Sequence, residues 1–292
     1  MKPETPYDEP LREDQTIVCS TSGGKDSTAL ALYFLKEAGL PNPLRFVFAD
    51  TGWEHPETYK YLDTLEKHLG VTIDRVKGEY DFVSICEKKG RFPSALARFC
   101  TEELKVKPLT KYIDAVIEAD EDPVVAVGIR AEESPKRALM SEWAYSGAYD
   151  APMWRPLIKW SAEEVFALHK KHGVPPNPLY LRGAGRVGCW PCIMARKAEF
   201  TNGFLAEDGM LQKLVEAEER VGVASRYGVA TFRSHDKVPK KFHDKEYTTD
   251  DGRHYTLPSA LALRNWAIDG NEPDPDGGSE PPTCFSQYGL CE

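Results

Sequence analysis

The sequence predicts an α/β fold built on a doubly wound parallel sheet, followed by a mostly helical extension that carries cysteines. Three short runs, at residues 16–20, 44–49 and 124–129, have the apolar and β-branched character of strands buried on both faces. Helix-forming segments separate them, and strands that alternate with helices form right-handed βαβ units. Ligands of such sheets bind beyond the carboxyl ends of the strands, so the loops that follow these runs are the candidate site.

Local signals predict the other elements in order. Residues 71–76 alternate between apolar and polar side chains, as in a further strand. Helices are indicated by caps, by prolines in a first turn and by apolar residues at helical spacing. These signals place helices after residue 27, from Pro56 to Gly70, from Asp81, after Pro108, from Ser161 to His172, and near residues 210–220 and 259–268.

The pattern of elements changes at about residue 150, where the regular alternation gives way to proline-rich turns and a C-x-x-C segment. Residues 269–282 are acidic and rich in Pro and Gly, which is typical of a flexible tether. The predicted organisation is an extended lead-in at 1–14, an α/β domain at 15–150, a helical region with the C-x-x-C at 151–268, and a tether with a cysteine-containing tail at 269–292.

The composition of the chain argues against two classes of protein, those with a broadly basic nucleic-acid-binding face and those that span a membrane. The chain has 292 residues, 41% of them hydrophobic, and a formal net charge of −9. This charge argues against a broadly basic nucleic-acid-binding face, although a local patch is compatible with it. An apolar run of 18 residues is absent, and the N-terminus is polar and proline-rich, so we expect a soluble, cytoplasmic protein without a membrane partner.

A glycine-containing loop follows the first predicted strand and opens the first helix. It reads S-G-G-K-D-S at residues 22–27. Two residues without Cβ atoms allow backbone N–H groups to close around an anion, and the helix N-terminus adds partial positive charge at the same point. The order of residues fits neither G-x-x-x-x-G-K-[ST] nor G-x-G-x-x-G. The loop is therefore a candidate phosphate site of another type.

The hexamer resembles the pyrophosphate-binding loop of the adenine nucleotide α-hydrolase (PP-loop) superfamily, which contains ATP pyrophosphatases and sulfonucleotide reductases and has a Rossmann-like, HUP-type sheet. The resemblance implies an adenine nucleotide, ATP or PAPS/APS, as ligand. It assigns the binding of phosphate or sulfate to the six residues of the loop, which are Ser22, Gly23, Gly24, Lys25, Asp26 and Ser27.

Two further segments resemble those of the sulfonucleotide reductases, also called PAPS reductases or CysH-like proteins. D-T-G with a following P-E-T begins at Asp50 and resembles the segment that lines the nucleotide pocket; it makes Asp50, Thr51 and Gly52 candidates. The segment from Gly128 resembles G-x-R-x-x-[EQ]-S-x-x-R. Two arginines suit bidentate binding of phosphate or sulfate oxygens. The candidates there are Gly128, Arg130, Ser134 and Arg137.

Three cysteines suggest a metal or cluster site. Cys189 and Cys192 form C-x-x-C in a glycine-rich turn, and Cys100 falls where cluster-bearing reductases carry a tandem pair, whose first member here is Phe99. The sequence does not identify a fourth ligand. There are three alternatives: Cys284 from the tail completes a [4Fe-4S] cluster, one iron of the cluster has no protein ligand, or the four cysteines hold zinc. Cys19 and Cys86 are expected to be core thiols.

The tail ends in Y-G-L-C-E. At this position the reductases carry a catalytic cysteine whose thiolate attacks the sulfur, and thioredoxin later releases sulfite. The corresponding residue here is Cys291, although the residue order differs. Together, R-P-L-I-K-W, P-N-P-L-Y, the C-x-x-C and this ending resemble CysH-like proteins of phages and plasmids, some of which accompany CRISPR or DNA-modification loci.

These observations favour an ATP pyrophosphatase that cleaves ATP between the α and β phosphates, directly or through an adenylated substrate. Lys25, Arg130 and Arg137 would offset developing charge, and Asp26 would help to hold Mg²⁺. The alternatives are a thioredoxin-dependent PAPS or APS reductase with Cys291 or Cys284 as nucleophile, and an accessory protein whose nucleotide controls binding to a nucleoprotein partner.

Overall fold

A seven-stranded sheet forms the centre of the computed structural model, which describes residues 4–206 and 209–269. Its strand order is β1-β6-β7-β5-β2-β3-β4, and a separate hairpin pairs β8 with β9. The strands are β1 (Glu4–Pro6), β2 (Thr16–Ser20), β3 (Leu44–Asp50), β4 (Ile73–Lys77), β5 (Pro123–Ala126), β6 (Trp143–Ser146), β7 (Ala151–Trp154), β8 (Lys245–Thr248) and β9 (His254–Leu257).

The sheet is mostly parallel, which confirms the predicted fold class. Strands β4, β3, β2, β5 and β7 run in one direction, whereas β6 is antiparallel to both β7 and β1. This antiparallel edge was not predicted. Its cause is local: four residues join β6 to β7, and only antiparallel neighbours can be joined by so short a connection. Because β7 begins at Ala151, the chain after residue 150 still adds a strand to this sheet.

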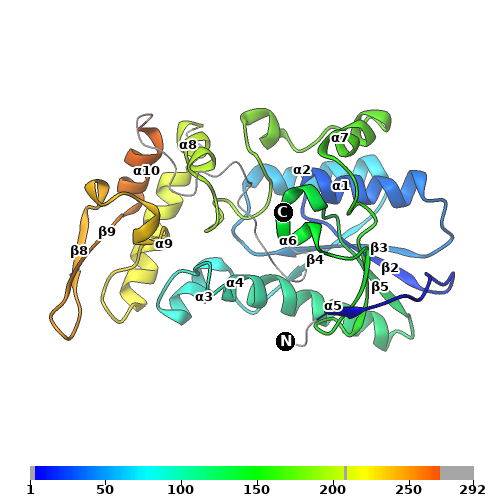
Figure 1. Ribbon diagram of the computed structural model, residues 1–292, viewed down its shortest axis with the longest axis horizontal. Coiled ribbons are helices and arrows are strands. Elements are labelled where there is room, and N and C mark those ends of the chain that lie inside the picture. Colours follow the sequence, from blue (N-terminus) through cyan, green and yellow to red (C-terminus); the bar gives the residue numbers. More distant parts are fainter. Residues whose placement is uncertain (1–3, 207–208, 270–292) are drawn as a thin grey trace.

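Helices cover both faces of the sheet, as Figure 1 shows. The helices are α1 (Lys25–Leu32), α2 (Pro56–Leu69), α3 (Phe82–Lys89), α4 (Phe99–Thr101), α5 (Lys107–Glu118), α6 (Pro135–Ala138), α7 (Ala162–Lys171), α8 (Lys197–Leu205), α9 (Met210–Ala224) and α10 (Ala260–Ile268). Single π-helical turns continue α1 over Tyr33–Glu37 and precede α5 over Glu102–Val106, and short 3-10 turns occupy Ala131–Glu133, Pro178–Arg182, His235–Lys237 and Lys240–Phe242.

Alternation along the central strands produces two cores. Ile17 and Cys19 on β2 pack with α1, α2 and α7, whereas Val18 between them packs with α5 on the opposite face. Successive side chains of a strand point to opposite faces, so a strand covered on both sides must be apolar at every position. This is why β2 reads as a continuous apolar run.

The predicted caps set the helix ends. The side chain of His55 accepts the Glu57 N–H at the start of α2, and Gly70 ends that helix with φ +66°. Asp81 and Ser84 form a capping box at α3, and Ser161 forms one with Glu164 at α7. These helices therefore begin where the sequence predicts.

A third core joins the C-terminal helices to the sheet domain. Phe82 of α3, Phe200 of α8, Leu214 of α9 and Trp266 of α10 belong to one buried cluster, together with Trp53 from the segment after β3. In Figure 1 these helices and the β8–β9 hairpin lie at the end of the molecule away from β1 and β5. Among the described residues, no helix is both long and apolar enough to cross a membrane.

Candidate active site

Residues 22–27, here called the glycine loop, form the end of the turn after β2 and the first turn of α1, at the carboxyl edge of the sheet. Gly23 has φ +78°, which favours glycine, and a Cβ there would lie 3.1 Å from the Thr58 methyl carbon. The Ser22 N–H donates to Ser27 Oγ at 3.1 Å, and the Gly24 N–H donates to Ser22 Oγ at 3.2 Å. The loop is therefore a tight turn directed into a helix N-terminus, the geometry that suits a phosphate.

Arg130 reaches the glycine loop from the segment after β5. Its Nε lies 2.5 Å from Asp26 Oδ1, and Lys25 Nζ lies 2.7 Å from Asp26 Oδ2. Burial works against the charged guanidinium, but the Asp26 carboxylate outweighs it and raises the pKa of Arg130. The Asp26 side chain is fully buried between these two cations. Two predicted motifs, 104 residues apart, thus meet in one charged cluster.

The same two segments touch through their backbones. A Cβ built on Gly128 would lie 2.7 Å from the carbonyl oxygen of Asp26, closer than real Cβ contacts allow. Glycine at this position therefore lets the segment after β5 pack directly on the loop. This gives a packing reason for Gly128, which the sequence analysis named only by resemblance.

The remaining predicted residues of the second segment shape its turn. The Ser134 hydroxyl accepts the Arg137 N–H at 3.1 Å and caps α6, and Glu133 accepts the Arg130 N–H at 2.6 Å. The Arg137 guanidinium pairs with the Glu133 carboxylate. Both arginines, Arg130 and Arg137, are buried. Nearby carboxylates hold each guanidinium in place.

Asp50 ends β3 and is held by three donors. It accepts from the Gly52 N–H at 2.9 Å and the Tyr59 hydroxyl at 2.7 Å, and it pairs with Lys77 at 2.9 Å. Burial alone would raise the pKa of this carboxyl, but Lys77, Gly52 and Tyr59 together lower it below its ordinary value. Gly52 has φ +67° and packs against Asp81, so the predicted D-T-G forms a fixed turn.

Glu54 is a buried carboxylate that the sequence analysis missed. It accepts from the Thr51 hydroxyl at 2.6 Å and from the Tyr59 hydroxyl at 3.0 Å. A cleft of about 340 Å³ opens beside it, lined among others by Ser22, Lys105 and Gly188. This cleft connects the glycine loop with the segment before the C-x-x-C. The sequence did offer a signal for Glu54, because this acidic residue lies inside the motif D-T-G-W-E-H-P-E-T.

The C-x-x-C segment is fastened to the turn after β3. Cys189 forms a β-bridge with Glu54, the Trp190 N–H donates to the Trp53 carbonyl at 2.7 Å, and the Trp53 indole N–H donates to the Pro191 carbonyl at 2.9 Å. Cys189 Sγ lies 3.9 Å from Thr51 Oγ1. The predicted cysteines and the predicted nucleoside-side residues are therefore neighbours.

We call Cys100, Cys189 and Cys192 the cysteine corner. All three pack against the C-terminal core. Burial raises the pKa of Cys100 to about 12, with further contributions from Cys189 and Cys192, and burial also raises the pKa of Cys189. Within residues 4–206 and 209–269, no three His, Cys, Asp or Glu side chains are grouped to hold a metal ion. Cys284 and Cys291 lie outside the described residues. Cys19 and Cys86 are buried, as predicted.

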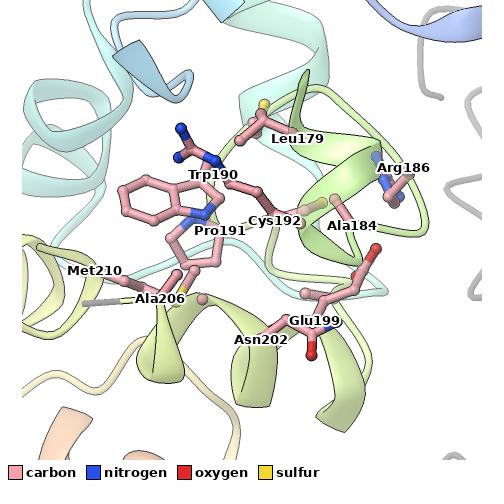
Figure 2. A pocket seen from close by; sticks show the side chains of 14 residues that line it. Leu179, Ala184, Arg186, Trp190, Pro191, Cys192, Glu199, Asn202, Ala206 and Met210 are labelled. Atoms are coloured by element: carbon pink, nitrogen blue, oxygen red, sulfur yellow. The ribbon is translucent and has the colours of Figure 1, made fainter. Parts of the chain in front are cut away.

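A second cleft, of about 560 Å³, lies beside the C-x-x-C. Figure 2 shows Trp190, Cys192 and Arg186 around it, with Glu199 and Asn202 contributed by α8. Burial raises the pKa of Glu199. Lys213, which the sequence analysis did not identify, donates to the Trp190 carbonyl at 2.9 Å and lies 4.1 Å from the centre of the Trp53 ring. Burial lowers the pKa of Lys213 to about 8.

The P-N-P-L-Y segment packs on the glycine loop. The Lys25 N–H donates to the Tyr180 hydroxyl at 3.0 Å, and the Asn177 side-chain amide donates to the Gly23 carbonyl at 3.2 Å. Asn177 is fully buried. In the sequence, this segment is informative only because it resembles CysH-like proteins. Its contacts with the glycine loop become visible only in the fold.

Asp26 does not fit the predicted role of a magnesium ligand in this arrangement. Both of its carboxylate oxygens are occupied by cations, Oδ1 by Arg130 and Oδ2 by Lys25. A divalent ion would have to displace one of them, and it would meet the remaining positive charge. We therefore assign Asp26 to holding Lys25 and Arg130 in position.

Comparison with known proteins agrees with these motifs. Residues 16–195 match the family model described as the phosphoadenosine phosphosulfate reductase domain. The chain is 33% identical to a 37.8 kDa protein of the gpa 5′ region of Escherichia phage 186, over 96% of this chain and 98% of that one. It is 32% identical to adenosine 5′-phosphosulfate reductase of Allochromatium vinosum, over 63% of this chain and 70% of the reductase.

Two solved structures show more distant likeness. The phosphoadenylyl-sulfate reductase of Candida auris, in a phosphate complex, aligns with a TM-score of 0.46 and 20% identity over 60% of this chain and 82% of that one. The U34-tRNA thiolase NcsA of Methanococcus maripaludis, with its [4Fe-4S] cluster, aligns with a TM-score of 0.43 and 17% identity over 73% and 72%.

Proposed function

Because this chain belongs to the phosphoadenosine phosphosulfate reductase domain family, we propose that it binds ATP at the glycine loop and cleaves it to AMP and pyrophosphate. The observation that carries the proposal is the buried Lys25–Asp26–Arg130 cluster at the mouth of a phosphate-type loop. Cations beside such a loop form strong, charge-assisted hydrogen bonds with a ligand that carries several negative charges. A triphosphate meets that condition.

The reaction requires charge to be offset on the departing pyrophosphate. A water molecule, or an acceptor substrate, adds to the α-phosphorus while the bond to the α–β bridging oxygen breaks, and the bonding electrons leave with pyrophosphate. Positioned cations stabilise this charge. Lys25, whose side chain is 13% exposed, is the cation with access to the ligand, and Arg130 supports it from the buried side.

The nucleoside end would lie toward the turn after β3. The cleft beside Glu54 has apolar walls from Phe48, Ala49 and Leu109 and a polar end at Ser22. A purine ring prefers such apolar walls, whereas the phosphates prefer the amides and cations at the polar end. These walls support a placement in which the base lies toward β3 and the phosphates lie toward the glycine loop.

Product analysis tests this assignment. Purified protein is incubated with ATP and Mg²⁺, and the products are separated by ion-exchange chromatography. We expect AMP and pyrophosphate in equal amounts. ADP and orthophosphate would contradict the proposed bond cleavage.

A second candidate is a thioredoxin-dependent PAPS or APS reductase. It is favoured by the contact between Cys189 and Thr51, which brings thiols to the nucleoside side of the site. A tail cysteine, Cys291 or Cys284, would attack the sulfur. The test supplies PAPS or APS with reduced thioredoxin and measures sulfite, which should disappear in Cys291→Ser or Cys284→Ser. Unchanged turnover in both variants excludes the tail cysteines as nucleophiles.

The cysteine corner also motivates a proposal about a cofactor. Thiolates are the ligands that iron–sulfur clusters and zinc prefer, but the described residues alone do not complete a site. We propose that Cys100, Cys189 and Cys192 hold a [4Fe-4S] cluster, completed by Cys284 or left open, with zinc as the alternative. Anaerobic purification followed by iron, sulfide and zinc analysis tests this. Metal content equal in the parent protein and in Cys189→Ser would contradict it.

A further inference from the structure

A third cleft, of about 1340 Å³, lies between the ends of two helices and the β8–β9 hairpin. Its lining comes from the end of α3, the loop after it, the end of α9, the residues that follow α9, and Tyr247 and Leu257 of the hairpin. In Figure 1 the hairpin lies at the outer end of the C-terminal region. None of these residues lines either cleft of the candidate active site. We call this feature the outer cleft.

The outer cleft concentrates positive charge on an acidic chain. Four cationic residues line it, Lys88, Lys89, Arg91 and Arg226, and no carboxylate residue does, although the chain as a whole carries a net charge of −9. All four cationic residues are exposed. A concave surface with charge of one sign attracts polyanions and concentrates them.

The partners of these cations leave them accessible to an anion. Arg226 pairs with Asp250 on the rim, and both side chains are 71% exposed, so the pair is weak and a phosphate can replace the carboxylate. The exposed Lys88 ammonium donates to the Tyr80 hydroxyl at 2.5 Å, and this bond, with smaller contributions from Glu79 and Glu103, raises the pKa of Lys88 and keeps it charged. The Arg91 guanidinium lies 5.8 Å from the centre of the Phe99 ring.

Tyrosine rings stand beside the cations. The rings of Tyr227 and Tyr247 have centroids 5.3 Å apart, and the Tyr247 ring stacks on Tyr255, its cross-strand neighbour, at 5.2 Å. Tyr227 is 41% exposed and Tyr255 is 36% exposed. The hairpin is separate from the main sheet. Its half-buried Tyr247 lies between Tyr227 and Tyr255, whose rings are the exposed members of this aromatic row.

We infer that the outer cleft binds single-stranded nucleic acid. Cations that follow a groove contact successive phosphates, and exposed aromatic rings stack on unpaired bases, which is the combination found in single-strand binding sites. A small anion would need neither the length of the cleft nor the tyrosines. A duplex keeps its bases stacked on one another and offers no free base to the tyrosines. This inference is independent of the proposed ATP cleavage.

Fluorescence anisotropy tests the inference. Labelled oligo(U) and oligo(dT) of about ten nucleotides, a length within the usual site sizes, are titrated with the full-length protein without ATP over a range of salt concentrations. We expect binding of at least one of the two oligomers, weakening as salt rises with a log–log slope of about −0.7 for each phosphate contacted. The same sequence annealed as a duplex should compete poorly.

Single substitutions separate the two contributions. Arg226→Ala should weaken binding severalfold and reduce the magnitude of the salt slope by about 0.7, because one phosphate contact is lost. Asp250→Asn should tighten binding, because it removes the competing carboxylate from Arg226. Tyr227→Ala should weaken binding about fivefold or more with an unchanged salt slope, and Tyr227→Phe should retain binding, which separates loss of stacking from a folding defect.

Two control variants test whether the effects are specific to the outer cleft. Lys111→Ala removes one exposed positive charge from α5, outside the outer cleft, and should leave binding unchanged. Lys25→Ala should also leave it unchanged, although it is expected to abolish most ATP cleavage. The inference is overturned if neither oligomer binds at low salt, if duplex competes as well as single strand, or if Lys111→Ala weakens binding as much as Arg226→Ala.

Discussion

The glycine loop and the cysteine corner are neighbours that reach their geometry by opposite routes. The loop consists of six consecutive residues whose hydroxyls and amides satisfy one another, and its charges are balanced in a buried cluster. The corner brings together Cys100 and the C-x-x-C from distant parts of the chain. Burial raises the pKa values of two of its thiols, Cys100 and Cys189. The loop is therefore fixed by its own hydrogen bonds and ion pairs, whereas burial keeps Cys100 and Cys189 of the corner neutral until something withdraws their protons.

The largest expected effect concerns the buried charges of the glycine loop. Asp26→Ala leaves the Arg130 guanidinium, 5% exposed, with only the half-exposed Glu132 carboxylate as a direct partner, and breaking such a buried pair costs about 3–5 kcal/mol of unfolding free energy. Denaturant unfolding measures this cost. Cys192→Ser, from the corner, should cost less than about 1 kcal/mol. Equal losses would show that the two regions do not differ in this way.

Activity should separate the two regions as well. Lys25→Ala removes the accessible cation of the loop and should lower ATP cleavage by about 10²–10³-fold, the usual effect of losing one stabilising group in a transition state. Cys189→Ser should leave ATP cleavage within about threefold, because its thiol is not placed at the phosphates in the proposed mechanism. A comparable loss in Cys189→Ser would mean that the corner acts in the same chemical step. Initial rates of pyrophosphate release provide the measurement.

Two glycines test how tightly each region is packed. In Gly128→Ala the new methyl group meets the Asp26 carbonyl oxygen at 2.7 Å, so we expect a loss of about 1–3 kcal/mol in stability and weaker ATP binding. Gly185→Ala, near the cysteine corner, meets only a Glu199 oxygen at 4.0 Å and should be close to neutral. Thermal unfolding and ATP titration of both variants measure the difference. A neutral Gly128→Ala would show that the two backbones are not in contact.

The smallest effect is a pH dependence at the border between the regions. The pKa of Asp50 is lowered in the folded protein, so its contribution to stability is present above the unfolded-state pKa near 3.9 and is lost as the pH falls through the folded-state value. Asp50→Asn keeps an oxygen acceptor but removes the charge. Because the Lys77 partner is 69% exposed, we expect a cost below about 1 kcal/mol at pH 7 that narrows as the pH falls below the unfolded-state pKa.

Lys77→Met provides the matched control for this pH dependence. It removes the same ion pair by changing the other partner. We expect a similar loss of stability at pH 7, and this loss should also become smaller as the pH falls. Thermal unfolding of the parent protein and both variants between neutral pH and pH 3 gives the comparison. A difference that stays constant across this range would mean that the hydrogen bonds of Asp50, and not its charge, carry its contribution.

The local features of this protein can be predicted from its amino-acid sequence. Continuous apolar strands identified a sheet covered on both faces, caps located the helix starts, and S-G-G-K-D-S identified the phosphate-type loop. These signals are readable because each depends on residues within one turn or one strand of each other. The antiparallel β6 and the short β1 escaped prediction because their pairing depends on where the chain returns to the sheet edge.

The contacts between the motifs become visible only in the folded protein. It placed Arg130 on Asp26, fastened the C-x-x-C to the turn at Glu54, and laid Tyr180 against the loop. It also reassigned Asp26 from a magnesium ligand to a carboxylate shared by two cations. Each of these contacts joins residues that are far apart in the sequence. Spacing along the chain carries no signal for such contacts, because they depend on how separate elements pack around a common core.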